Sequence, residues 1–276
     1  MKTKNRLLLT SAMMLALVAV SGTTATYAWW VTTLQATASV NTVTAKADAD
    51  LSVEMKEGYK TKLKEDGETI EVLDAGSLTD VSSGDGLTFH KATLNSNEQV
   101  TDLVKVELKD DYANKIYYGI QFSASISMPS LNPGLVYNVY LGDGLGTNQL
   151  IDDQSDDTSV RMAVTDSTNI MVFGNSDNKQ YQTKDESGSI ITAECTNYHQ
   201  LTGTLTEETV ATEVLSFGKV SDKDVYCLGN LDDKTDVIEI TFTMWFEGNI
   251  TKDGVEEDEL FKSNIYFYAI KVTETN

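Results

Sequence analysis

The sequence predicts an all-β protein, an antiparallel β-sandwich with a jelly-roll-like arrangement, preceded by an N-terminal signal helix. Short segments alternate apolar and polar residues with a period of two, which is typical of half-buried strands. Thr, Val, Ile and Tyr are common and proline occurs only twice, a composition that favours strands. No helical periodicity continues beyond the N-terminal segment. Hydrophobic residues make up 41% of the 276 residues, enough to form a core.

The N-terminal segment has the three parts of a secretory signal. A basic start precedes an apolar run over 7–20 and a small-residue exit that ends at Ala28. We therefore expect residues 1–28 to direct secretion and a signal peptidase to cleave between Ala28 and Trp29. The apolar run is short for a membrane span of about 20 residues, so we expect no span in the mature protein. An uncleaved N-terminal anchor is the alternative.

The remaining residues, 29–276, are expected to form one secreted β domain. Period-two alternation over 34–40 and 43–55 predicts an extended N-terminal strand at about 29–55. Many of its apolar positions are alanines, so it buries little surface and needs a partner. The polar segments 56–82 and 174–189 are expected to be a loop or weak hairpin and a surface loop, respectively.

Further strands follow from the same alternation. The last of them is apolar on both sides, which indicates a central position covered on both faces. The predicted strands cover residues 87–94, 104–108, 116–128, 135–141, 160–164, 170–173, 190–195, 213–217, 224–228, 238–246 and 265–272.

The chain is strongly acidic, with a formal net charge of −21. Removing residues 1–28 takes away three positive charges and no negative charge, so the mature chain carries −24. This charge disfavours nucleic acid and anionic membrane surfaces as partners. It favours cations or basic partners, although acidity is also ordinary among exported proteins.

Two acidic loops offer the carboxylate oxygens that calcium prefers. Neither has the ligand spacing of an EF-hand, so each is either a calcium-stabilised loop or a solvated acidic loop. No other cofactor is expected. The candidate calcium ligands are Asp152, Asp153, Asp156, Asp157, Asp253, Glu256 and Asp258.

Cys195 and Cys227 are the only cysteines. In an oxidising compartment they could form one disulfide. The alternative is two separate buried or semi-buried thiols. Two cysteines with no nearby histidine at ligand spacing do not make a zinc site.

Trp245 lies on the face of its strand opposite to Ile240 and Phe242. Exposed beside Glu247, it could stack on a sugar ring or a partner protein, and this makes it a candidate binding residue. The alternative is an indole buried in a two-layer sheet. No nucleophile motif such as Gly-x-Ser-x-Gly occurs, so catalysis is not expected.

Three short segments resemble exported proteins of Gram-positive bacteria. The signal exit over 22–30 resembles that of the TasA/camelysin group, and the segments over 159–164 and 243–248 resemble strands of related exported proteins. The resemblance implies a secreted β-sandwich of the cell surface or biofilm matrix. In fibre-forming members, the N-terminal strand completes the sandwich of a neighbouring subunit. No His-Glu-x-x-His motif occurs, so the metalloprotease activity ascribed to camelysin does not carry over.

The sequence thus predicts a non-catalytic, secreted surface or extracellular-matrix protein, whose assembly would use the N-terminal strand. It would contact itself or other matrix proteins. The alternatives are a secreted adhesion module that binds glycan or protein, and an exported hydrolase without a recognisable motif.

Overall fold

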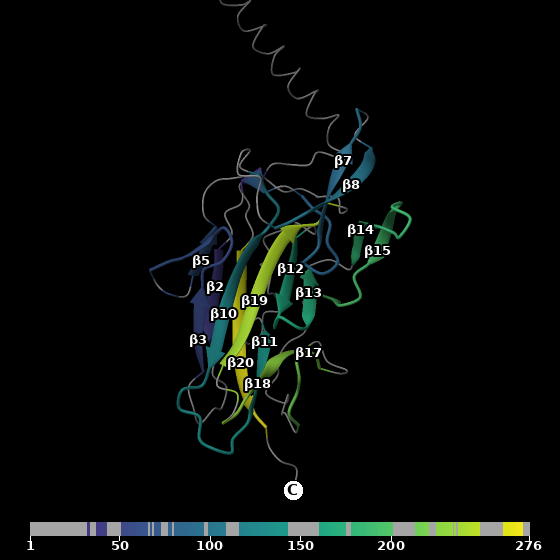
Figure 1. Ribbon diagram of the computed structural model, residues 1–276. Helices are drawn as coiled ribbons and strands as arrows, with labels where there is room; N and C mark the ends of the chain where they lie inside the picture. The colour runs from purple at the N-terminus through teal and green to yellow at the C-terminus, as the bar shows by residue number, and fades with distance from the viewer. Residues whose placement is uncertain are drawn as a thin grey trace, which may run out of the picture.

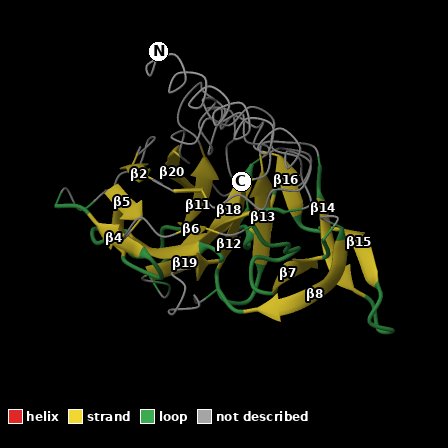
Figure 2. Cartoon of the chain, turned by 90° about the horizontal axis from the view of Figure 1, so that it is seen from above, coloured by secondary structure: helices red, strands yellow, loops and turns green. Residues whose placement is uncertain are grey.

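The chain is all-β wherever a computed structural model describes it, and these parts contain strands and turns but no helix (Figures 1 and 2). The predicted all-β class is confirmed. The signal segment and the cleavage residues Ala28 and Trp29 lie outside the described residues. The described residues are 32–33, 37–42, 51–65, 67, 69–72, 77–78, 80–96, 99–108, 116–142, 160–174, 178–200, 213–220, 225–233, 235, 237–248 and 262–272.

One of the two large sheets has six strands. Its neighbouring strands are antiparallel except for the last pair at one edge, β13 and β16, which is parallel. In spatial order the strands are β16 (Tyr198–Gln200), β13 (Ile170–Gly174), β12 (Val160–Thr165), β19 (Val237–Phe246), β10 (Ile120–Ser127) and β3 (Ser52–Lys56).

The other large sheet has seven strands. All of its pairs are antiparallel except β20 with β2, which run in the same direction. In spatial order the strands are β17 (Gly218–Lys219), β18 (Tyr226–Leu231), β11 (Tyr137–Gly142), β20 (Lys262–Lys271), β2 (Thr37–Thr42), β5 (Thr69–Val72) and β4 (Thr61–Leu63). The strand predicted to be central, β20, does lie inside its sheet.

Three smaller sheets complete the described fold. Two of them are the hairpins β7 (Phe89–Leu94) with β8 (Val100–Val106) and β14 (Gln180–Lys184) with β15 (Ile190–Glu194). Both hairpins lie at the same side of the molecule, beside β12 and β13 (Figures 1 and 2). The third sheet joins β1 (Thr32–Thr33), β6 (Ser77–Leu78) and β9 (Ile116–Tyr117).

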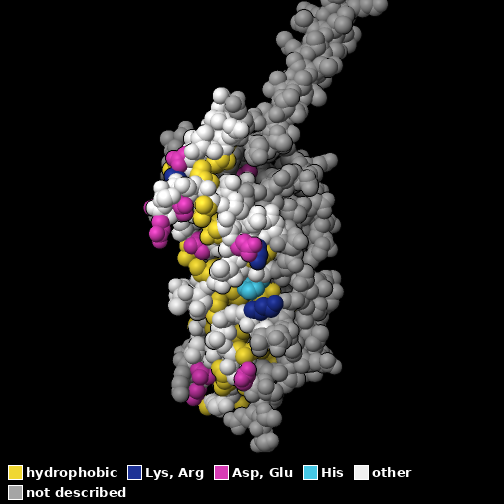
Figure 3. All heavy atoms as spheres, turned by 90° about the vertical axis from the view of Figure 1, so that its right-hand side faces the viewer, with side chains coloured by type: hydrophobic (Ala, Val, Ile, Leu, Met, Phe, Trp, Pro, Cys, Tyr) yellow, Lys and Arg dark blue, Asp and Glu magenta, His cyan; other side chains and the backbone are white. Residues whose placement is uncertain are grey.

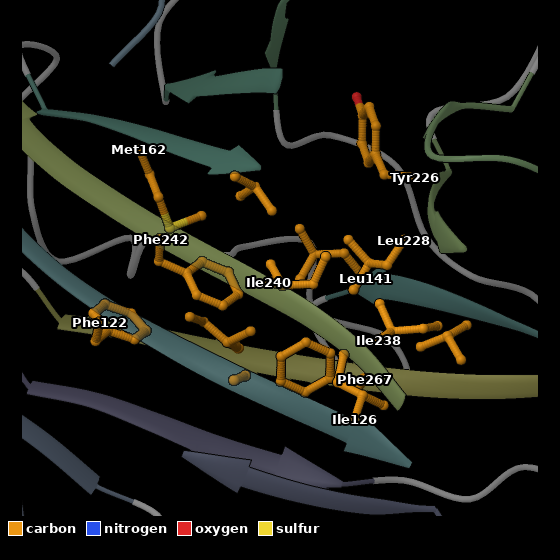
Figure 4. Packing of buried hydrophobic residues seen from close by; sticks show 14 of the residues in the cluster. Phe122, Ile126, Leu141, Met162, Tyr226, Leu228, Ile238, Ile240, Phe242 and Phe267 are labelled. Carbon is orange, nitrogen blue, oxygen red and sulfur yellow. The ribbon is translucent and has the colours of Figure 1, made fainter. Parts of the chain in front are cut away.

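The main hydrophobic core takes side chains from both large sheets. Phe122 on β10 and Phe242 on β19 are register partners, and their rings stack with centroids 4.9 Å apart. Phe267 on β20, in the other large sheet, meets the Phe242 ring edge-on at 6.3 Å (Figure 4). Because burying one such side chain contributes about 1.5–3 kcal/mol, this row of aromatic rings helps to hold the two sheets together.

Several predicted strand boundaries were wrong. The strand expected over 116–128 is interrupted at Gly119, where an added Cβ atom would lie 2.7 Å from the carbonyl oxygen of Met244. The segment 174–189, expected to be a loop, contains β14, whose residues are mostly polar and pair with β15. No strand covers 213–217. A polar hairpin strand shows no hydrophobic alternation. Only its pairing with the neighbouring strand identifies it.

Candidate functional site

A second, smaller core lies on the outer face of the six-stranded sheet. Successive residues of a strand point to opposite faces, so Ala163 and Trp245 point away from the main core, which contains Met162 and Met244. Phe89 of the hairpin β7–β8 covers this outer face, and its ring meets the Trp245 ring edge-on at 5.7 Å. The buried members of this outer core are Val81, Phe89, Tyr118, Ala163, Val172, Cys195 and Trp245.

Trp245 is therefore buried, with only 1% of its surface exposed. Its indole Nε1 donates a hydrogen bond to Oε2 of Glu247 at 3.4 Å. The predicted stacking of an exposed Trp245 on a ligand is wrong, because the segment before β7 and the hairpin itself cover this face. The buried alternative is the one found.

The covering segment 81–83 is joined to the sheet by backbone hydrogen bonds. The N–H of Val81 donates to the carbonyl of Phe246 at 3.0 Å, and the N–H of Gly248 donates to the carbonyl of Val81 at 2.9 Å. On its other side, Ser82 exchanges two backbone hydrogen bonds with His90, at 2.8 and 2.9 Å. Segment 81–83 thus connects the end of β19 to β7.

Glu247 lies at the centre of this junction, with 1% of its surface exposed. Its carboxylate accepts hydrogen bonds from the Ser82 hydroxyl at 2.5 Å and the Ser83 backbone N–H at 3.0 Å, besides that from Trp245. Burial raises the pKa of Glu247 from 4.5 to about 7, although these donors and the charge of Arg161 act in the opposite direction.

Arg161 is a second buried charged residue in the cluster, 3% exposed, and it is the register partner of Trp245. Its Nη1 donates to the carbonyl of Val160 at 2.9 Å and its Nη2 to the carbonyl of Asn178 at 2.5 Å. The guanidinium carbon lies 5.0 Å from the centre of the Tyr198 ring. Arg161 therefore links β12 to the chain that enters β14.

The two cysteines are free thiols in separate clusters, so the predicted disulfide is wrong. Cys195 lies in the outer core, where its thiol donates to the carbonyl of Gly84 at 2.9 Å. Cys227 is buried on the outer face of the seven-stranded sheet, with Tyr140, Val225 and Tyr268. Burial raises the pKa of both thiols, that of Cys227 to about 11.

This arrangement suits a structural junction better than a reaction centre. The Ser82 hydroxyl and the Glu247 carboxyl are both at most 2% exposed, so a substrate could not reach them without movement of the covering segment. The sequence pattern places Arg161 in the strand predicted over 160–164 and Glu247 beside Trp245, but it does not bring the two segments together. The contact between the two segments depends on the register of β12 and β19, which local patterns do not specify.

The predicted calcium ligands fall outside the described residues. They are Asp152, Asp153, Asp156, Asp157, Asp253, Glu256 and Asp258. In the part of the chain that the structure describes, no three metal-ligating side chains come together.

The same part contains no helix that is long and apolar enough to cross a membrane. No protein-family model and no curated protein matches the chain.

Proposed function

We propose that this chain is a non-catalytic, secreted structural protein of the cell surface or extracellular matrix, and a fibre subunit that assembles by N-terminal strand donation. In this proposal a signal peptidase removes residues 1–28, and the exported chain contacts copies of itself or other matrix proteins. The resemblance of the signal exit to the TasA/camelysin group supports export. The position of β2 is the observation that carries the assembly.

Strand β2 lies inside the seven-stranded sheet although it comes from the N-terminal segment. It pairs in parallel with β20, from Thr37 opposite Lys262 to Thr42 opposite Phe267, and antiparallel with β5. The neighbouring strands β20 and β5 therefore present backbone N–H and C=O groups on both sides of the position that β2 occupies. The same residues of a second copy can satisfy those groups equally well, since main-chain hydrogen bonds dominate the pairing of a strand with small side chains.

The finer architecture belongs to the same proposal. One core shared by the six-stranded and seven-stranded sheets supports a β-sandwich with a jelly-roll-like arrangement. Because Ser82 and Glu247 are buried, the proposal gives these two side chains a structural role. The proposal keeps both alternatives for the two acidic loops: they bind calcium, or they are acidic loops that only water solvates.

Cross-linking between β2 and β20 tests strand donation directly. Ser39 and Asn264 are register partners, so Ser39→Cys and Asn264→Cys place thiols on adjacent strands. Mixing the two single variants of the chain starting at Trp29, at assembling concentrations, should give covalent dimers with a short thiol cross-linker. The pair Ser123→Cys and Thr241→Cys, partners within β10 and β19, is the control and should cross-link only as a double variant.

A truncated chain gives the complementary test. Deleting residues 29–49 removes β2 and keeps β3, so we expect a folded monomer that shortens filaments of the intact chain when added in small amounts. Light scattering shows whether the truncated chain is a monomer, and negative-stain microscopy measures the length of the filaments. An unfolded truncated chain, or an intact chain that stays monomeric at all concentrations, would mean that β2 belongs permanently to its own sheet.

A further inference from the structure

Strand β15 is an open edge of the hairpin β14–β15. Figures 1 and 2 both show it at the rim of the molecule, with β14 on its inner side. Among the described strands it pairs only with β14, and no bulge interrupts the pairing from Ile190 to Glu194. One side of its backbone therefore faces away from the rest of the described fold.

The hydrogen bonds at the two ends of the hairpin identify the backbone groups on this open side. The N–H of Cys195 donates to the carbonyl of Lys179 at 2.9 Å, and the N–H of Asp185 donates to the carbonyl of Ser189 at 3.0 Å. Antiparallel partners exchange hydrogen bonds at every second residue, so the odd-numbered residues of β15 bond to β14. The outward N–H and C=O groups belong to Ile190, Thr192 and Glu194.

Strand β15 lacks the features that normally keep a sheet edge from pairing with another chain. Protected edges carry lysine, proline or a bulge, and β15 has none of these. By contrast, Lys56 lies on the outermost strand β3 and Lys105 on β8. The only charged residue of β15, Glu194, lies at its end and forms an ion pair with Lys179 at 2.7 Å. The other four residues are uncharged and include Ile191, which is 39% exposed.

We propose that β15 pairs antiparallel with β15 of a second copy of this chain, so that the two hairpins form one four-stranded sheet. A register centred on Thr192 aligns all five residues of both strands and keeps the two Glu194 residues about 14 Å apart along the sheet. Each Ile190 then lies opposite Glu194 of the second copy, and each Ile191 lies opposite Ala193. The contact satisfies the outward backbone groups and covers part of the exposed Ile191 side chain.

The charges around β15 make a second copy a suitable partner. Two ion pairs, Lys179–Glu194 and Lys184–Asp102, balance charged side chains on and beside the hairpin. In the antiparallel register, the acidic turn of each hairpin lies toward the uncharged residues 195–197 of the second copy and not toward its acidic turn. The net charge of −21 opposes association of two copies in general, but this edge is locally balanced.

This contact is separate from strand donation, since it uses neither β2 nor β20. Strands of five residues bury little surface, so the pair is weak by itself, as small interfaces are. In a fibre, where many copies are held close together, the same contact would join neighbouring subunits side by side. A covalent trap is therefore the appropriate test.

Thiols at the centre of the proposed pair test the contact directly. In this register the two Thr192 Cα atoms lie about 5.5 Å apart, within reach of a short thiol cross-linker. Gln180→Cys is the matched control, because Gln180 is exposed on the same hairpin but its two copies would lie about 20 Å apart across the four-stranded sheet.

Both variants are made in the chain starting at Trp29, which contains every described residue. We expect Thr192→Cys to give covalent dimers at least about tenfold faster than Gln180→Cys, since only the first pair of thiols meets the distance requirement. The wild-type chain, whose cysteines Cys195 and Cys227 are buried, gives the background rate.

A proline on the open side separates strand pairing from folding. Ile190→Pro removes one outward N–H but no bond to β14, because proline is tolerated at the first residue of an edge strand whose N–H faces solvent. Combined with Thr192→Cys, it should slow cross-linking to the rate of Gln180→Cys. Ile190→Ala keeps the N–H and should retain most of the cross-linking. Hydrogen exchange at the amides of Ile191 and Ala193, which bond to β14, shows whether the hairpin is intact.

Equal rates for Thr192→Cys and Gln180→Cys would overturn the pairing of two copies and leave the edge to a strand of another protein or to water. Rapid cross-linking that Ile190→Pro does not slow in an intact hairpin would equally contradict backbone pairing. If the proline variant loses the hairpin, the comparison of Thr192→Cys with Gln180→Cys decides alone. The cross-link between Ser39→Cys and Asn264→Cys reports strand donation separately, so either contact can fail without the other.

Discussion

Two glycines let the turn after Ser83 pack closely against its neighbours. A Cβ atom at Gly84 would lie 2.5 Å from the Tyr181 ring. A Cβ atom at Gly86 would collide with Ala163 and lie 3.0 Å from the Trp245 ring, and Gly86 also has a φ of +67°. The turn can therefore cover the outer core only with these small residues.

Gly86→Ala should destabilise the fold by about 2–4 kcal/mol, because it adds a clash to the cost of a positive φ. Gly67→Ala is the matched control: Gly67 has a φ of +73°, and nothing lies within 4 Å of its added Cβ atom. We expect the control to cost about 1 kcal/mol. Urea unfolding measures both free energies. Equal losses would show that the contact with Ala163 and Trp245 is not tight.

Strand β19 connects the two cores because its opposite faces serve different partners. Phe242 faces the main core between the large sheets, while Trp245 faces the outer core beneath the hairpins. Near the start of the strand, Val237 is 45% exposed and belongs to neither core. The energetic importance of a position on β19 should therefore depend on its face and on its place along the strand.

Phe242→Ala should cost about 3–5 kcal/mol, since it removes a fully buried ring that contacts both Phe122 and Phe267. Val237→Ala on the same strand should change the free energy of unfolding by less than about 0.5 kcal/mol. Denaturant titration of both variants gives the comparison. A small loss for Phe242→Ala would argue that the two large sheets do not share one packed core.

At the scale of the whole molecule, net charge opposes compactness. The chain carries −21 overall, and on the face shown in Figure 3 the hydrophobic side chains form a broken strip among acidic, basic and other side chains. Like charges repel more strongly in the compact chain than in the unfolded chain, and dissolved salt screens this repulsion.

Added sodium chloride should therefore raise the Tm, and a gain of about 1 kcal/mol would move it by about 2–4 °C in a domain of this size. If the added ions only screen the repulsion between charges, magnesium chloride and calcium chloride at equal concentration should raise the Tm equally. A larger shift with calcium that disappears in Asp152→Asn or Asp253→Asn would instead identify a calcium site in the acidic loops.

The sequence alone determined the all-β class and the approximate place of most strands, because period-two alternation is a local property of each segment. It correctly placed β12, β13, β19 and β20, whose buried faces are rich in large apolar residues. It could not detect β14, which has few apolar residues and exists because β15 pairs with it.

Only the tertiary structure decided what surrounds each side chain of the candidate site. The alternation around Trp245 showed which face of the strand it occupies but not that hairpin β7–β8 covers that face. The sequence likewise could not place Cys195 and Cys227 in separate clusters, or bring Ser82 to Glu247 across 165 positions of the chain. These outcomes depend on strand order and register, which arise from contacts between distant segments and leave no local pattern in the sequence.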